Sequence, residues 1–150
     1  MNKKLLSILF AVIFSICIAI PSSTDAAVEC YNSGTWSITL SHNPEAGTKD
    51  SSELQAICKG NLVASGSLKA TSTSPNGGSV TVTVSVMQEK FGFDTTVKEQ
   101  DIKLTLNGSA KNFTINAGDV PLGNYYIKVK IGENEQEISI LGSGNFKLKR

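Results

Sequence analysis

The chain of 150 residues has few of the side chains that most often carry chemistry. It contains one histidine, three cysteines and one tryptophan, and its single arginine is Arg150. A nucleic-acid-binding surface needs a stripe of Lys and Arg, whereas the formal net charge here is +1. We therefore expect no nucleic-acid partner. The pattern also lacks a long helical segment, which argues against a helical bundle.

Catalytic and metal-binding motifs are missing as well. The sequence has no Gly-x-Ser-x-Gly elbow, no Cys-x-x-Cys motif and no Asp-x-Asp-x-Asp-Gly calcium loop, and a zinc site would have to be built with one histidine. That histidine, His42, lies among turn residues, where a solvated side chain is expected and a ligand-binding role is the alternative. We expect no catalytic residue, no metal and no cofactor. A small secreted hydrolase with a site assembled around His42 is a further alternative.

The first 26 residues read as a secretory signal peptide. Lys3 and Lys4 precede the mostly apolar stretch 5–20, and a polar segment with small residues ends at Ala26. A retained membrane anchor is the alternative, but the apolar stretch is shorter than the ~20 residues of a spanning helix. We predict cleavage after residue 26 and a secreted, extracellular single domain of residues 27–150. Cleavage removes Lys3, Lys4 and Asp25, so the net charge falls from +1 to zero.

Two cysteines remain in the predicted mature chain, Cys30 and Cys58. An even number of cysteines in an oxidising compartment indicates a disulfide, and two cysteines allow only one intramolecular pairing. We therefore predict a Cys30–Cys58 bridge with a structural role. A reactive cysteine is the alternative, although the sequence shows no catalytic dyad.

The strongest pattern in the chain is the alternation of valines and hydroxyl residues in 79–87. Successive side chains of a strand point to opposite faces. The stretch is therefore predicted to be a strand that buries one face of a sheet and leaves the other wet. The valines on the predicted buried face are Val80, Val82, Val84 and Val86.

Several shorter stretches alternate in the same way and are separated by Gly, Asn and Pro turns. Asp50 and Glu53 resemble a helix cap, so one short helix near 51–59 is also predicted. Together they predict an all-β fold, an antiparallel β-sandwich of seven or eight short strands, immunoglobulin-like or of a related sandwich type. A barrel is the less favoured alternative. The remaining predicted strands lie within 34–40, 62–70, 95–106, 111–116, 125–131, 136–141 and 146–148.

Two turns predict strand pairing. The Ser-Pro-Asn-Gly-Gly segment at 74–78 is typical of a hairpin, so strand 62–70 is expected to pair with strand 79–87. Asn107-Gly108 predicts a second hairpin, which joins the strands on either side of it. If the first hairpin left its valine face uncovered, it would resemble a transmembrane β-hairpin. A membrane-active hairpin of residues 62–87 is therefore an alternative.

The Pro121-x-Gly123-x-Tyr125 segment resembles the start of a late strand in sandwich modules of bacterial surface proteins. Sandwich proteins commonly bind through end loops and exposed sheet faces. The sequence therefore predicts a non-catalytic binding or structural protein outside the cell, with a carbohydrate, another protein or its own copies as partner. The predicted ligand-binding residues are Tyr126 as an aromatic platform, with Lys128, Lys130 and His42.

Overall fold

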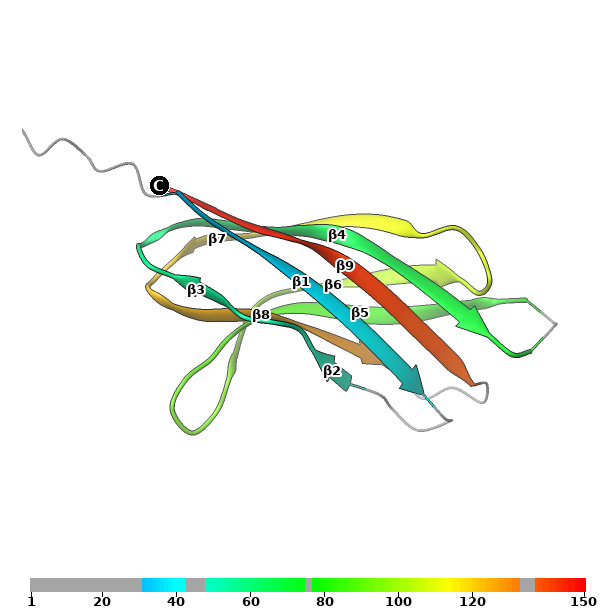
Figure 1. Cartoon of the computed structure of the whole chain (residues 1–150). Helices are drawn as coiled ribbons and strands as arrows, with labels where there is room; N and C mark the ends of the chain where they lie inside the picture. The colour runs from blue at the N-terminus through cyan, green and yellow to red at the C-terminus, as the bar shows by residue number, and fades with distance from the viewer. Residues whose placement is uncertain (1–30, 43–47, 75–76, 133–136) are drawn as a thin grey trace, which may run out of the picture.

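The computed structural model describes residues 31–42, 48–74, 77–132 and 137–150, and for His42 and residues 48–50 it describes the backbone alone. The described residues form β-strands and contain no helix (Figure 1). None of them therefore belongs to a helix that is long and apolar enough to cross a membrane. The strands are β1 Tyr31–His42, β2 Thr48–Asp50, β3 Leu54–Ala56, β4 Gly60–Ser72, β5 Ser79–Gln88, β6 Thr95–Thr105, β7 Lys111–Val120, β8 Gly123–Ile131 and β9 Ile138–Lys149.

The strands form two antiparallel sheets that pack face to face (Figure 1). One sheet has the order β1-β9-β4-β7, and the other has the order β2-β8-β5-β6, with β3 also paired to β8. The predicted antiparallel β-sandwich is confirmed. The described residues hold nine strands instead of seven or eight. Stretches expected to be turn or helix form β2 and β3, whereas residues 138–141 and 146–148, predicted to lie in two strands with a turn between them, belong to one strand, β9.

The connections between the strands follow the jelly-roll pattern. Apart from β2 to β3 and β5 to β6, each connection passes from one sheet to the other. The first strand, β1, lies next to the last strand, β9, and β9 lies between β1 and β4. A double sheet of this order is the jelly roll rather than a stack of local hairpins.

Both predicted hairpins are therefore wrong. Strand β4 pairs with β7 and β9, whereas β5 pairs with β6 and β8, so the 62–70 and 79–87 stretches lie in different sheets. The Asn107-Gly108 turn likewise leads from β6 in one sheet to β7 in the other. Asn107 has a left-handed φ of 58°, and its side-chain amide exchanges two hydrogen bonds with the Ser72 backbone at the end of β4. The turn thus reverses the chain and fastens one sheet to the other.

The helix predicted near 51–59 is also wrong. Its central residues form β3, which pairs with the start of β8 from Tyr125 to Gly123. Leu54 and Ala56 are buried while Gln55 between them is exposed, which is the two-residue period of a strand. Burial of two apolar side chains against the core and the ladder with β8 outweigh the resemblance to a helix cap.

The valine strand lies at the centre of the core, as predicted. Val80, Val82, Val84 and Val86 are buried, and the alternate residue Thr81 is exposed. The same division holds in β8, where Tyr125, Ile127, Val129 and Ile131 are buried. Because the valine face is covered and β4 does not pair with β5, the alternative of a membrane-inserting hairpin over residues 62–87 is wrong.

Three glycines make room for the tryptophan in this core. A Cβ atom at Gly66 or Gly144 would overlap the Trp36 ring, and one at Gly142 would overlap Leu68. Trp36 is buried and its ring centroid lies 5.7 Å from that of Phe113 on β7. The absence of side chains on β4 and β9 at this level therefore lets the indole lie directly under the sheet.

Candidate functional site

The outward side of the β1-β9-β4-β7 sheet carries an array of short polar side chains, which we call the hydroxyl face. Its residues alternate with the buried residues of the same strands. Within the array only Lys69 is charged and only Leu141 is apolar. The hydroxyl face consists of Thr35, Ser37, Thr39 and Ser41 of β1, Ser139, Leu141, Ser143 and Asn145 of β9, Ser65, Ser67, Lys69 and Thr71 of β4, and Asn112 and Thr114 of β7.

The strand register arranges these side chains in rows across the sheet. Neighbouring strands are about 4.8 Å apart, so members of a row present hydroxyl and amide groups at a regular spacing. Each such group can donate and accept hydrogen bonds. Two complete rows are Ser37, Ser143, Ser67 and Asn112, and Thr35, Asn145, Ser65 and Thr114.

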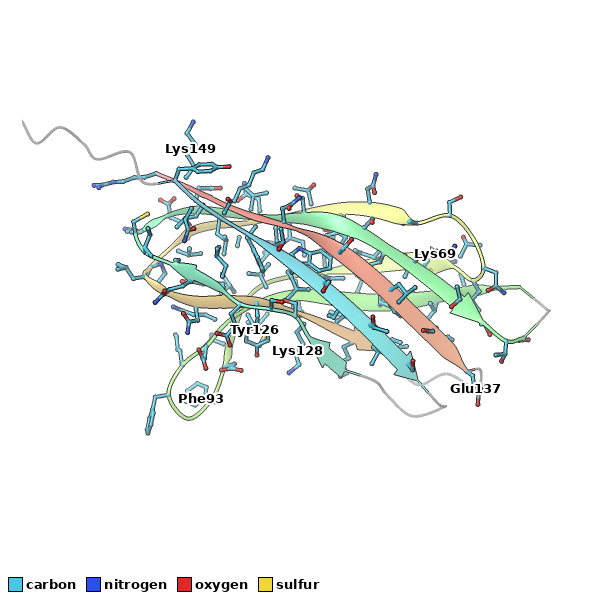
Figure 2. All side chains as sticks on the ribbon, in the orientation of Figure 1. Lys69, Phe93, Tyr126, Lys128, Glu137 and Lys149 are labelled. Atoms are coloured by element: carbon cyan, nitrogen blue, oxygen red, sulfur yellow. The ribbon has the colours of Figure 1, made fainter. Side chains whose placement is uncertain are left out.

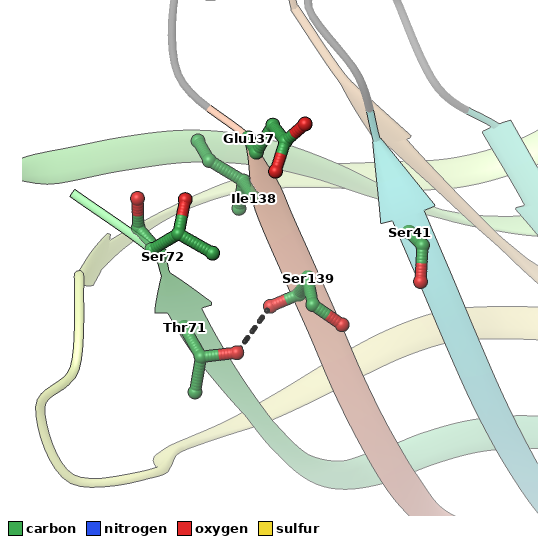
Figure 3. A pocket seen from close by; sticks show the side chains of 7 residues that line it. Ser41, Thr71, Ser72, Glu137, Ile138 and Ser139 are labelled. Atoms are coloured by element: carbon green, nitrogen blue, oxygen red, sulfur yellow. Dashed lines mark hydrogen bonds between the residues drawn. The ribbon is translucent and has the colours of Figure 1, made fainter.

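The rows run into a hollow at one end of the sheet (Figure 3). The hollow has a volume of about 420 Å³. The Thr71 hydroxyl donates a weak hydrogen bond of 3.4 Å to the Ser139 carbonyl oxygen, which ties β4 to β9 at its floor. Its lining residues are Ser41, Thr71, Ser72, Thr73, Glu137, Ile138 and Ser139.

Two further hollows lie along the sheet. One, of about 290 Å³, lies over Lys69, Leu141 and Ser143. The other, of about 400 Å³, lies beside Thr35 and Ser143 at the β1 edge. The hydroxyl face is therefore grooved along its length, and one carboxylate, Glu137, stands at its end.

The outer face of the opposite sheet has a different character. Its rows combine cations, hydroxyls and carboxylates, and the hydroxyl of Thr83 donates a 2.7 Å hydrogen bond to Asp101 Oδ1. Such a mixed charged surface is what solubility requires of any small domain. Lys128 and Lys130, predicted as ligand-binding residues, lie on this face, and so they are separated from the hydroxyl face by the whole sandwich. Two rows are Lys128, Ser85 and Glu99, and Lys130, Thr83 and Asp101.

Tyr126 does not offer the exposed aromatic platform that the sequence suggests. Its side chain is 5% exposed, because the segment between β5 and β6 covers it (Figure 2). Its hydroxyl donates a 2.5 Å hydrogen bond to Asp94 Oδ2 in that segment. Tyr126 therefore holds a loop in place.

His42 is the last residue of β1, opposite Ile138 and next to Ser41 of the large hollow. Its side chain lies outside the described part of the structure, so the roles predicted for it stay predictions. No group of three His, Cys, Asp or Glu side chains suited to a metal ion occurs among the described residues. Cys58 packs against the core, whereas Cys30 lies outside the described residues, and their pairing stays a prediction.

The hydroxyl face was not predicted from the sequence. The alternation of Ser and Thr with apolar residues in β1, β4 and β9 is visible in the sequence as a sign of a wet sheet face. Nothing local shows that these three strands lie side by side, because 65 or more residues lie between β9 and either β4 or β1. Only the jelly-roll order combines them into one surface.

The sequence matches no protein-family model and no curated protein. The fold is similar to that of several solved structures. A protein from the disulfide-linked pili that form Bacillus endospore appendages is 16% identical, with a TM-score of 0.45 over 81% of this chain and 89% of that one. A CBM4 structure is 12% identical, with a TM-score of 0.47 over 78% of this chain and 77% of that one.

A protein of the infectious bursal disease virus Gx strain has a TM-score of 0.50 at 11% identity. The similarity covers 81% of this chain and 32% of the viral chain, so this chain spans about a third of that protein. At identities this low the likeness shows the fold alone.

Proposed function

We propose that this chain is a secreted, non-catalytic β-sandwich protein that binds an extracellular polysaccharide through its hydroxyl face. The single observation that carries the proposal is the array of hydroxyl and amide side chains in register across four strands. The proposal includes a signal peptide of residues 1–26 and a single domain of residues 27–150.

A neutral, hydroxyl-rich polymer fits the chemistry of this face. One net hydrogen bond is worth only about 0.5–1.5 kcal/mol, so a useful affinity requires many of them at once. The repeated rows provide donors and acceptors over the length of the sheet, and an extended chain can engage several rows together. Lys69 is the charged residue within the array, with Lys147 beyond one end of it and Glu137 beyond the other, so a charged ligand gains few ion pairs there.

The hollow at the Glu137 end adds a carboxylate, which the rows lack. The Glu137 carboxylate accepts hydrogen bonds from ligand hydroxyls, and bonds to an ionised acceptor are about twice as strong as neutral ones. Ile138 lines the same hollow but is almost fully buried, so it offers a ligand little apolar surface. We expect this end to fix the direction in which a polymer lies on the face.

The test is retention on a panel of insoluble polysaccharides. Replacement of Ser67 or Ser143 by glutamate places a charge in the middle of the array and should abolish retention on the polymer that holds the parent. Thr81→Glu is the matched control, since Thr81 is exposed on the opposite sheet across from Lys103. Retention of the two face variants equal to that of the parent, or no retention of the parent on any polymer, would contradict the proposal.

Secretion has its own test. Expression of the full chain in a bacterial host should release a protein that begins at Ala27 or Val28, with no membrane-retained form. Mass spectrometry of the culture supernatant measures the N-terminus directly. A released protein with an intact Met1 would show that the signal peptide is not cleaved.

A further inference from the structure

Most of the exposed large apolar side chains of the described residues gather at one end of the sandwich, which we call the apolar end. They occupy the start of β1, the segment after β3, the β5–β6 loop and the β7–β8 turn. The strand register brings these segments together. Tyr31 of β1 and Asn61 of β4 both lie opposite Lys149, β3 ends opposite Gly123, and Gln88 at the end of β5 lies opposite Tyr125. The side chains of the apolar end are Tyr31, Ile57, Phe91, Phe93 and Leu122.

The two phenylalanines project furthest. Phe91 and Phe93, in the segment between β5 and β6, are 106% and 75% exposed. Figure 2 shows Phe93 in the loop that hangs below the sheet. Gly92 between them has a φ of 91°, a left-handed conformation that L side chains rarely adopt. Phenyl rings as exposed as these add nothing to the hydrophobic core. Clusters of large exposed apolar groups mark interaction sites.

Hydrogen bonds at its base hold this loop in shape. Asp94 accepts a 2.5 Å bond from the Tyr126 hydroxyl and a longer one of 3.4 Å from the Lys90 amide. Glu89 is bonded to Asn124 twice, through its backbone amide at 3.0 Å and through its carboxylate at 2.8 Å. Both carboxylates of the loop thus point back to β8, while the rings point outward.

Cations stand beside the apolar side chains. Lys90 precedes Phe91, Lys59 follows Ile57 by two residues, and Lys149 lies opposite Tyr31 across β1 and β9. Figure 2 shows Lys149 and Phe93 at the same end of the molecule, with Glu137 at the other end. Asp119 lies in the same row as Lys149, across Asn61, so this end carries a carboxylate as well as the lysines. Apolar groups flanked by long basic side chains match a lipid surface, in which acyl chains lie beneath a layer of phosphates.

We propose that the apolar end docks on the surface of a lipid bilayer that contains anionic lipids. A protruding tip with two phenyl rings fits a deformable lipid interface better than a flat protein surface. Phe91 and Phe93 enter the boundary between headgroups and acyl chains, and the nearby lysines contact phosphates. The strands then stand upright on the membrane, and the hydroxyl face points sideways and stays free. This docking does not depend on polysaccharide binding.

The experiment is sedimentation of the folded, secreted protein with vesicles of phosphatidylcholine and phosphatidylglycerol. The double variant Phe91→Ser/Phe93→Ser should lower the partition coefficient by about tenfold or more, given the area of the two rings. Its melting temperature should match that of the parent, because neither ring is buried. Leu141→Ser is the matched control, since Leu141 is 48% exposed far from this end, and its vesicle binding should equal that of the parent.

Vesicles of phosphatidylcholine alone should bind the parent more weakly, and Lys59→Gln/Lys90→Gln should reduce binding to the anionic vesicles. Three outcomes would overturn the proposal. These are a parent that stays in the supernatant, a Phe91/Phe93 variant that sediments as the parent does, and a parent whose phenylalanines support self-association without vesicle binding.

Discussion

At the scale of single residues, the position of a side chain relative to the two layers determines its effect. Val84 is fully buried in β5 between β6 and β8. Val84→Asp places an unpaired charge in the core and should destabilise the fold by several kcal/mol. Thr81→Asp is the control, because Thr81 is exposed and lies opposite Lys103, so its melting temperature should stay close to that of the parent. Equal thermal melts for both variants would contradict the assignment of Val84 to the core.

Because of Tyr125, the stability of the fold should depend on pH in the alkaline range. It is buried, its hydroxyl donates a 2.7 Å hydrogen bond to the Pro121 carbonyl oxygen, and burial raises the pKa of this phenol above 10.0, against a smaller opposing effect of Gln88. The unfolded chain therefore ionises first as pH rises. The contribution of neutral Tyr125 is complete below about pH 10 and is lost as the pH passes through the raised pKa. Urea unfolding midpoints of the parent should fall in that range more steeply than those of Tyr125→Phe. Parallel curves would show that Tyr125 is not responsible.

At the scale of elements, the predicted disulfide would join the beginnings of two strands of one sheet. Tyr31, which follows Cys30, lies opposite Lys149, and Lys149 lies opposite Asn61 near the start of β4. Cys58 lies two residues before β4, so both cysteines precede strands that flank β9 at this end of the sheet. Reduction should therefore lower the stability of the secreted protein by about 3 kcal/mol. The double variant Cys30→Ser/Cys58→Ser should show the lower stability without reductant and no further change with it. Two free thiols in the untreated protein would reject the bridge.

The sequence predicts the individual strands well but not which strands pair with one another. Alternation predicted the strands and their buried faces in β1, β5 and β8, because period two depends only on neighbouring residues. The same patterns do not predict which strands pair. The turns at 74–78 and 107–108 have hairpin residues, yet both cross between sheets, since packing of two layers decides the partner. The hydroxyl face was missed for the same reason, and Tyr126 was misjudged because a loop covers a position that alternation assigns to the outside.

At the scale of the whole molecule, the topology makes the last strand essential to the first. Strand β9 pairs with β1 on one side and β4 on the other, so one sheet is incomplete without it. A chain that lacks residues 138–150 should not unfold cooperatively, whereas loss of Arg150 alone should be harmless, because that residue is exposed and outside the strand. Circular dichroism in urea distinguishes the two. Pairing of such distant segments also predicts refolding on the slow scale of milliseconds to seconds.

The buried position of Trp36 makes it an intrinsic fluorescent probe of the protein. The single indole lies against Gly66 and Gly144, directly beneath the backbone that carries Ser143 and Asn145 on its other side. Its N–H finds no hydrogen-bond partner among the described residues, which places the chromophore in an apolar environment. Its emission should therefore be blue-shifted and shielded from aqueous quenchers. The rows of the hydroxyl face lie on the other side of the same backbone. Binding of a polymer to these rows should therefore change the tryptophan fluorescence, so that binding can be measured without a dye.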